Sequence, residues 1–317
     1  MSIAFVFPGQ GSQSVGMQAD FAGACPEVAT AYEEAGEALG YDLWGLVQGG
    51  PAARLDETVV TQPAMLTAGV GAWRAWRSAG GASPALVAGH SLGEYTALVC
   101  AGSIGFADAV RLVQRRAELM QAAVPTGSGA MAAIIGLDDE AVAAACEEAA
   151  DGDIVSPVNF NSPGQVVIAG AKAAVERAIE SATSAGARRA MLLSVSVPSH
   201  CALMEPAAAE LRAALADVEI AAPEIPVVSN VDVATYEDAE QIRDGLRRQL
   251  HNPVRWVETV RHMAAAGVDT IVECGPGKVL TGLSRRIDKS IRGISLDSAE
   301  AMADAMADLA GEAATPA

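Results

Sequence analysis

Ser91 stands in the run GHSLG (residues 89–93), the G-x-S-x-G pattern of a serine nucleophile held on a sharp turn. An apolar stretch, 85–88, precedes the run and a stretch of helical composition, 94–100, follows it, which is the context of a nucleophile elbow. The small glycines tolerate a strained turn, and the backbone N–H of Leu92 would point at the oxyanion of a tetrahedral intermediate. The run therefore predicts acyl chemistry at Ser91; the alternative is an ordinary serine in a glycine-lined turn.

A serine hydroxyl is hardly ionised at neutral pH, so Ser91 needs a general base, and the chain has four histidines. His90 adjoins the serine, and a nucleophile elbow would aim it elsewhere. His262 falls in a predicted helix, 257–266, as a surface or packing residue. His200 and His251 both lie in loop-like segments. We favour His200, which follows a strand-like run, although the residues by themselves leave His251 open.

Arg116 is predicted to face the protein interior. Residues 108–121 have the spacing of an amphipathic helix, and Arg116 falls on its apolar stripe, whereas Arg111 and Arg115 fall on the other face. A buried guanidinium is unfavourable unless an anion pairs with it, and its planar fork matches a carboxylate. That anion would be an Asp or Glu of the chain or the free carboxylate of a substrate.

The run FPGQGSQ (residues 7–13) brings unpaired backbone N–H groups to the end of a predicted strand. It lacks the third glycine of a dinucleotide-binding loop, because Ser14 occupies that position. The run suits the second donor of an oxyanion hole; the alternative is a tight turn without a further role.

Short apolar runs predict the strands that position these residues. The runs at 3–7 and 85–88 are closed by glycine-containing turns and followed by helical composition, the rhythm of a parallel α/β sheet. Similar runs recur at 225–229 and 270–272. The predicted core therefore uses both ends of the chain.

The middle of the chain predicts a separate small unit. Two segments, 130–137 and 165–169, are strand-like, and each is followed by an alanine-rich segment with helical spacing, 140–150 and 171–185. We interpret residues 126–194 as a small domain inserted into a large one, which residues 1–125 and 195–317 form together.

Composition limits the partners. The 317 residues are 51% hydrophobic, with 39 acidic and 21 basic side chains and a net charge of −18. Such a chain is globular, and its charge disfavours nucleic acid, which proteins bind through lysine and arginine. We expect no membrane span and no signal peptide. Five scattered cysteines predict reduced thiols in a cytoplasmic protein and no metal site: Cys25, Cys100, Cys146, Cys201 and Cys274.

Taken together, these residues resemble the malonyl-CoA:acyl carrier protein transacylases of fatty acid synthesis. Besides FPGQGSQ and GHSLGE, the chain carries SPVNFNSPGQ from Ser156, VPSHCALM from Val197, QLHNPVRW from Gln249 and GPGKVLTGL from Gly275. The matches extend from residue 7 to about residue 283. The resemblance implies an α/β-hydrolase-like core with a parallel sheet, interrupted by an inserted ferredoxin-like α+β subdomain.

The resemblance also implies roles for individual residues. Ser91 would accept the acyl group, His200 would be its base, and Arg116 would hold the malonyl carboxylate. In this family a backbone carbonyl orients the imidazole, and Gln249 matches the residue beside the histidine. No catalytic acid is therefore expected.

Two backbone N–H groups complete the implied site, because those of Gln10 and Leu92 match the family's oxyanion hole. The implied reaction transfers a malonyl group from malonyl-CoA to the phosphopantetheine thiol of acyl carrier protein through a malonyl-serine. It needs no metal or cofactor, and a monomer is the family expectation. The alternatives are a discrete malonyl acyltransferase that serves a polyketide synthase, a serine thioesterase or other hydrolase, and a catalytically silent binding subunit.

Acyl carrier proteins are acidic and CoA carries phosphates, so an acidic enzyme needs a local basic patch to bind them. Arg285, Arg286 and Lys289 gather in one short segment. They form either a docking site for carrier protein or CoA, or the solvated end of a helix.

Overall fold

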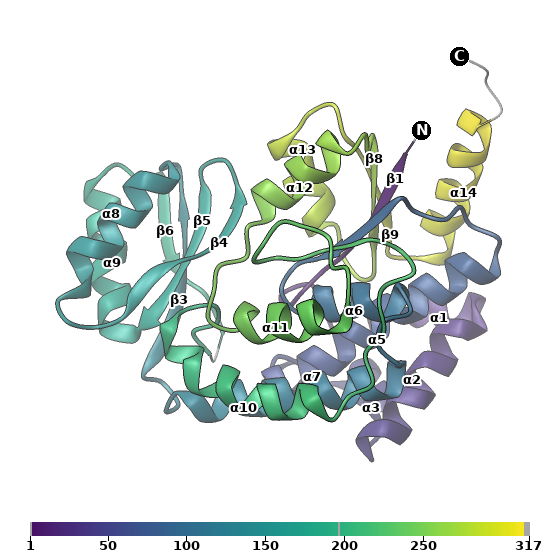
Figure 1. Cartoon of the computed structure of the whole chain (residues 1–317), viewed down its shortest axis with the longest axis horizontal. Helices are drawn as coiled ribbons and strands as arrows, with labels where there is room; N and C mark the ends of the chain where they lie inside the picture. The colour runs from purple at the N-terminus through teal and green to yellow at the C-terminus, as the bar shows by residue number, and fades with distance from the viewer. Residues whose placement is uncertain (1, 196, 314–317) are drawn as a thin grey trace.

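The computed structural model describes residues 2–195 and 197–313, which form a large α/β body and a smaller α+β body (Figure 1). The strands are β1 (Ile3–Phe7), β2 (Leu86–Gly89), β3 (Gly129–Ile135), β4 (Val155–Ser162), β5 (Gln165–Ala171), β6 (Arg189–Leu192), β7 (Val227–Val228), β8 (Thr270–Cys274) and β9 (Arg292–Leu296). The predicted fold class, a parallel α/β core with a small α+β unit, is confirmed.

Helices connect these strands. They are α1 (Ala19–Ala24), α2 (Pro26–Leu39), α3 (Leu43–Gly49), α4 (Ala52–Leu55), α5 (Thr58–Ser78), α6 (Gly93–Cys100), α7 (Phe106–Ala123), α8 (Asp139–Ala150), α9 (Lys172–Ser184), the 3₁₀ turn η1 (Ala202–Met204), α10 (Glu205–Ala216), α11 (Ala239–Gln249), α12 (Trp256–Ala265), α13 (Val279–Ile287) and α14 (Ala299–Ala313). Among the described residues, every helix is too short or too polar to cross a bilayer.

The sheet of the large body has five parallel strands in the order β7-β2-β1-β8-β9. Alternate side chains of β1 enter two separate cores, Phe5 and Phe7 on one face and Ala4 and Val6 on the other. Because helices cover both faces, β1, β2 and β8 are buried and almost wholly apolar. The strands are parallel, so the loops after β1, β2 and β8 meet at the end of the sheet formed by the carboxyl ends of its strands.

The strands predicted at both ends of the chain are present, but the edges of the sheet differ from expectation. The run 225–229 contributes only the short strand β7, and β9 is an additional edge strand. β9 is only half-buried over most of its length and begins Arg-Gly, so its sequence lacks the continuous apolar run of a central strand.

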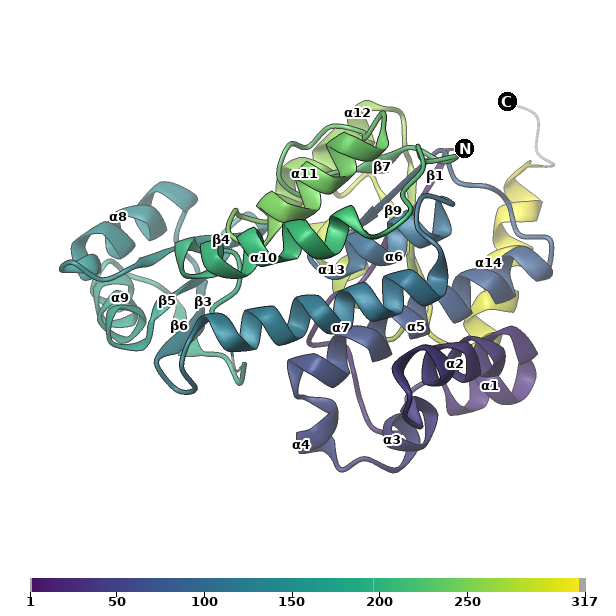
Figure 2. The ribbon, with the colours of Figure 1, turned by 60° about the horizontal axis from the view of Figure 1, so that its bottom comes forward.

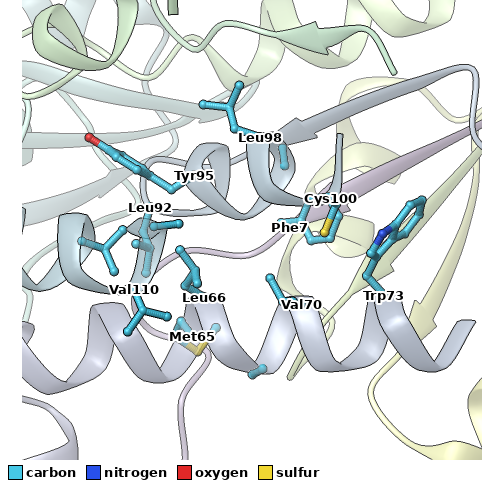
Figure 3. Packing of buried hydrophobic residues seen from close by; sticks show 14 of the residues in the cluster. Phe7, Met65, Leu66, Val70, Trp73, Leu92, Tyr95, Leu98, Cys100 and Val110 are labelled. Atoms are coloured by element: carbon cyan, nitrogen blue, oxygen red, sulfur yellow. The ribbon is translucent and has the colours of Figure 1, made fainter. Parts of the chain in front are cut away.

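Helix α5 crosses the larger core and packs against the nucleophile elbow at Ser91. Nearly all of its residues are buried, as expected of a helix enclosed on every side. Figure 3 shows Met65, Leu66 and Val70 of α5 facing the helix that carries Leu92 and Tyr95 at its start. The elbow therefore rests on a packed layer rather than on a loop.

The small body has an antiparallel sheet in the order β4-β5-β3-β6, with α8 and α9 packed on it. Its β-α-β-β-α-β succession is that of a ferredoxin-like unit. The sequence predicted β3, β5, the two helices and a strand-like run, 191–197, before His200; the structure ends β6 at Leu192, so that run overlaps the strand only at its end. β4 was missed because Pro157 and several asparagines give it the composition of a loop and its pairing is bulged.

The two bodies are joined by long helices and by main-chain pairing. Helix α7 leads out of the large body toward β3, and α10 lies beside it on the return path (Figure 2). Strand β4 also pairs with the segment before α12, because the N–H of Val254 donates to Val158 and that of Phe160 donates to Val254. These contacts fix the small sheet over the edge of the large one.

Candidate active site

Ser91 lies on a strained turn between the end of β2 and the start of α6. Its φ is +52°, in the left-handed region that residues with a side chain seldom adopt. A Cβ at Gly89 would lie 1.8 Å from the carbonyl carbon of Gly93, and one at Gly93 would lie 2.0 Å from the carbonyl oxygen of Phe7. Both glycines of the motif are therefore required by close backbone approach, as a nucleophile elbow demands.

The structure brings His200 to the serine. Its Nε2 lies 2.7 Å from Ser91 Oγ, and its Nδ1 lies 2.7 Å from the carbonyl oxygen of Gln249. A carbonyl only accepts, so Nδ1 carries the proton and Nε2 is free to accept one from the serine. Burial, and then the charge of Arg116, lowers the pKa of His200 to about 3. The imidazole is thus neutral at physiological pH, the state that a general base needs.

The other histidines lie outside this arrangement. His90 Nε2 is 2.8 Å from Asn161 Oδ1, and its ring packs against Trp256. His251 is half-buried beyond the end of α11, and His262 is half-buried on α12. Of the two histidines left open by the sequence, the structure places His200 beside Ser91.

Arg116 of α7 is 1% exposed, and its guanidinium enters the same site. Its Nη1 donates to Gln62 Oε1 at 2.8 Å, and its Nη2 donates to Gln249 Oε1 at 3.0 Å and lies 3.3 Å from Ser91 Oγ. Among the described residues no carboxylate forms an ion pair with it, and its Nε has no partner. The sequence left two possible anions for Arg116, and the first of them, an Asp or Glu of the chain, forms no direct pair with it in the described structure.

Arg111 and Arg115 lie on the other face of α7, as predicted. Both are exposed, and both form ion pairs one turn along the helix, with Asp108 and Glu118 respectively. The apolar periodicity of α7 therefore separated its one buried arginine from its surface arginines.

Gln10 and Leu92 line the cavity in front of Ser91. Leu92 stands directly before α6, and Gln10 lies in the turn after β1. Neither backbone N–H has a hydrogen-bond partner within the described part of the chain. The side chain of Gln10 is held away from this role, because its Oε1 accepts a hydrogen bond from Thr58. Two free backbone donors thus border the space where an acyl oxygen would lie.

This cavity has a volume of about 120 Å³ and lies between the two bodies. The large body contributes the residues described above, while Met131 and Asn159 come from the small sheet. The connecting segment adds an apolar wall of Leu193, Val195 and Val197. Ser91 and Arg116 both line this cavity, so a small group bound in it would contact both. Among the described residues, no group of histidine, cysteine and acidic side chains is arranged to hold a metal ion.

Three polar residues of the site were missed by sequence reasoning. Asn230 accepts a hydrogen bond from the N–H of Ser91 at 2.7 Å and donates to the carbonyl of Gly89 at 2.6 Å, which holds the turn at both ends. Gln62 contacts Arg116, and Glu94 is fully buried below the turn. Only Glu94 carried a signal, since a charged residue follows the serine motif inside an apolar helix.

The predicted docking residues lie apart from the cavity. Arg285 and Arg286 are exposed on the last turn of α13, and Lys289 is exposed just after it. Arg286 Nη1 donates to Gln165 Oε1 of the small sheet at 2.9 Å. Arg286 also lines a groove between the two bodies together with Arg188 and Arg189.

Known proteins share both sequence and fold with this chain. A family model described as "Acyl transferase domain" matches residues 4–307. The malonyl CoA-acyl carrier protein transacylase of Escherichia coli (strain K12) is 61% identical over 303 residues, which cover 96% of this chain and 98% of that protein. The protein of the same name from Bacillus subtilis (strain 168) is 42% identical over 299 residues, 94% of each chain.

Solved structures agree. The acyl carrier protein S-malonyltransferase of Vibrio cholerae O1 biovar eltor superposes with a TM-score of 0.94 at 57% identity, covering 96% of this chain and 100% of that one. A malonyl-transacylase solved in complex with its type II polyketide synthase acyl carrier protein superposes with a TM-score of 0.96 at 56% identity, covering 97% and 100%.

Proposed function

The chain belongs to the malonyl-CoA:acyl carrier protein transacylases, a family of acyl transferases, and we propose that Ser91, His200 and Arg116 carry out its reaction. The enzyme transfers the malonyl group of malonyl-CoA to the phosphopantetheine thiol of acyl carrier protein. One observation carries the assignment of residues. Ser91 Oγ lies 2.7 Å from His200 Nε2 and 3.3 Å from Arg116 Nη2, so base, nucleophile and carboxylate-binding cation meet at one atom.

In the first half-reaction Ser91 Oγ attacks the thioester carbonyl of malonyl-CoA while His200 Nε2 takes the hydroxyl proton. The negative charge that develops on the carbonyl oxygen is stabilised by the N–H groups of Gln10 and Leu92. The C–S bond then breaks, and the proton held by His200 goes to the departing CoA sulfur. Malonyl remains as an ester on Ser91.

The second half-reaction reverses these steps with a different thiol. His200 takes the proton of the phosphopantetheine thiol, the sulfur attacks the malonyl ester, and Ser91 leaves with that proton. The carbonyl of Gln249 holds the imidazole in the tautomer that both halves require. We propose that the transfer needs no metal or cofactor, because the thioester is already activated and fixed N–H donors stabilise the oxyanion.

Arg116 gives the site its preference for a dicarboxylic acyl group. The hydrogen bonds of this guanidinium go to two neutral amides and a hydroxyl, and its carbon lies 5.5 Å from the centre of the Tyr95 ring, so it retains N–H donors for a charged carboxylate. It binds that carboxylate in both the substrate and the acyl-enzyme, so it selects the acyl group rather than accelerating the bond changes.

Carrier protein and CoA are proposed to dock on the basic groove between the two bodies, which Arg286 lines. Arg285, Arg286 and Lys289 were predicted for this role, and Arg188 and Arg189 lie across the groove from Arg286. Their shared positive charge on an enzyme of net charge −18 supports attraction of an acidic partner to this face.

The organisation of the chain follows the same proposal. Residues 1–125 and 195–317 form the catalytic domain and 126–194 the inserted subdomain, because the antiparallel sheet is built wholly from residues 129–192. We expect the enzyme to act as a monomer in the cytoplasm, without nucleic acid or membrane partners.

Intact-mass measurement tests the residue assignment. Incubation with malonyl-CoA should add one malonyl group to the protein, and holo acyl carrier protein should then remove it. Ser91→Ala should take up none, whereas Ser199→Ala, which removes another hydroxyl from the same cavity, should still be labelled. Label in Ser91→Ala would reject the proposed nucleophile, and an adduct that decays to free malonate without carrier protein would favour a hydrolase.

The choice of acyl carrier protein tests whether the enzyme serves fatty acid synthesis or a polyketide synthase. A fatty acid synthase carrier and a polyketide synthase carrier compete for the malonyl-enzyme, and the ratio of transfer rates separates the two assignments. We expect the fatty acid carrier to be preferred; a preference for the polyketide carrier would support the second assignment, for which a structural relative was solved with such a carrier.

A further inference from the structure

Glu94 is a buried carboxylate that the reaction described above does not use. It lies on the first turn of α6, three residues after Ser91, and is 0% exposed. It accepts hydrogen bonds from Tyr236 Oη at 2.5 Å, from Gln249 Nε2 at 2.6 Å and from the N–H of Asn230 at 3.3 Å. Burial raises the pKa of Glu94 to about 7, and among the described residues no basic side chain contacts the carboxylate, so its position calls for a reason.

The contact with Gln249 fixes which way that amide points. Gln249 Nε2 donates both to Glu94 and, at 3.0 Å, to the carbonyl oxygen of Ser91. Glu94 Oε2 also accepts from the N–H of Asn230, and the carbonyl oxygen of Ser91 can only accept, so the amide oxygen of Gln249 must lie on the opposite side. There it accepts from Arg116 Nη2. With the amide turned over, its NH₂ would face the N–H groups of the guanidinium, and no hydrogen bond would form on either side.

A second amide holds the other side of the guanidinium in the same manner. Gln62 Oε1 accepts from Arg116 Nη1, and Gln62 Nε2 donates to Thr58 Oγ1 at 2.9 Å. The hydroxyl of Thr58 in turn donates to Gln10 Oε1, so it must accept from Gln62. Arg116 is thus held between two neutral amide oxygens whose directions are set by groups behind them.

This arrangement keeps the positive charge of Arg116 available. A direct pair with Glu94 would saturate the guanidinium and compete with a substrate carboxylate. Burial lowers the pKa of Arg116, whereas Tyr95 and, to a smaller extent, the charge of Glu94 raise it. The cation therefore stays protonated without losing its N–H donors to an internal acid.

We propose that Glu94 is a positioning residue whose carboxylate fixes the amide of Gln249, and through it the guanidinium of Arg116, so that the site selects acyl groups bearing a carboxylate. The proposal rests on the proposed function, because it concerns how that reaction chooses its acyl group. It assigns Glu94 to selectivity rather than to the proton transfers between Ser91 and His200.

The test compares acylation of the enzyme by malonyl-CoA and by acetyl-CoA. Glu94→Leu keeps the volume of the side chain and removes the oxygen that accepts from Gln249. It should lower the malonyl-to-acetyl ratio of kcat/KM by about 10- to 100-fold, chiefly through KM for malonyl-CoA. Glu94→Gln retains an oxygen that can accept from Gln249, and should keep the ratio within about threefold of wild type. Any general damage to the elbow affects both substrates and cancels in the ratio.

A double-mutant cycle makes the route through Gln249 measurable. Gln249→Leu keeps the backbone carbonyl that His200 needs and should lower the ratio as Glu94→Leu does. The double variant, which removes both partners and leaves neither one buried alone, should show no further loss. This variant also serves if Glu94→Leu by itself does not fold.

Each outcome is decisive. A folded Glu94→Leu with the wild-type ratio, a Glu94→Gln as impaired as Glu94→Leu, or losses that add in the double variant would overturn the inference while the wild-type enzyme still forms its malonyl-serine. A wild-type enzyme that takes up no malonyl group would overturn the proposed function, and the inference with it.

Discussion

The Nη2 atom of Arg116 lies 3.3 Å from the Oγ atom of Ser91, so the buried guanidinium and the proposed nucleophile share one small cavity. A malonyl group has one methylene between its thioester carbonyl and its carboxylate. Under the proposed assignment, a carbonyl at Ser91 brings the carboxylate within reach of the guanidinium, so a short acyl chain would be recognised at both ends.

Arg116→Ala should lower kcat/KM for malonyl-CoA by about 100-fold, since it removes charge-assisted hydrogen bonds to a desolvated carboxylate. Acetyl-CoA has no carboxylate, so acetyl transfer should rise relative to malonyl transfer. Arg115→Ala, one residue away and exposed, is the matched control and should leave both rates unchanged. An unaltered malonyl preference in Arg116→Ala would contradict the assignment of this arginine.

The pH dependence of acylation should be that of a base with a lowered pKa. An imidazole of pKa 6.5 would lose about 30-fold in its neutral form between pH 8 and pH 5. Since the pKa of His200 is lowered to about 3, kcat/KM for malonyl-CoA should stay nearly level over that range. A fall centred near pH 6.5 that His262→Gln, on the remote helix α12, does not alter would contradict this.

The same pKa has a consequence for stability. The unfolded chain takes up the proton of His200 near pH 6.5, whereas the folded chain resists it down to about pH 3. The unfolded state therefore binds more protons between these values, and stability from this residue is present above pH 6.5 and is lost as the pH falls. Denaturant unfolding of wild type and His200→Gln gives the free energy of unfolding at each pH. The loss of stability from His200 should appear only in wild type, and parallel pH profiles for the two proteins would argue against the lowered pKa.

Gly89→Ala should remove acylation and lower the free energy of unfolding by about 3 kcal/mol or more, because its Cβ would overlap the backbone of Gly93. Gly282 offers a matched control inside α13, where an added Cβ meets nothing within 4 Å. Gly282→Ala should stabilise the protein by about 0.5–1 kcal/mol through helix propensity and keep full acylation. Chemical denaturation and malonyl labelling check both, and an active Gly89→Ala would disprove the elbow geometry.

Reversing the charge of the proposed docking arginines should weaken the binding of carrier protein without changing the rate of acyl transfer at Ser91. Arg285→Glu with Arg286→Glu should raise the apparent KM for carrier protein about tenfold and flatten its salt dependence, since docking charges are screened by salt. Labelling by malonyl-CoA tests CoA docking separately. Arg77→Glu, at an exposed arginine on the last turn of α5 that does not line this groove, is the control. An unchanged KM for carrier protein would remove this groove from the docking proposal.

Local sequence was sufficient for the elbow. Gly89, Ser91 and Gly93 are close along the chain, and the strand before them and the helix after them follow from periodicity. The buried face of α7 followed in the same way, because the helical repeat by itself separates Arg116 from Arg111 and Arg115. Strand β4 did not, because an irregular strand with proline and asparagine lacks the apolar pattern that identifies a strand, and the bounds of β6, a short exposed edge strand, were predicted too far along the chain.

The sequence by itself determined the nucleophile turn, the parallel α/β class and the buried side of Arg116, since each depends on residues that are neighbours along the chain. Tertiary structure alone decided which histidine meets Ser91, because His200 is 109 residues away and is placed by its contact with the end of α11. It also decided that Arg116 faces the amides of Gln62 and Gln249 instead of an acid, and that Glu94 stands behind them. These choices depend on how α5, α6, α7 and α11 pack together. Hydrogen bonds between distant side chains form only once that packing removes the water that would otherwise bind each of them.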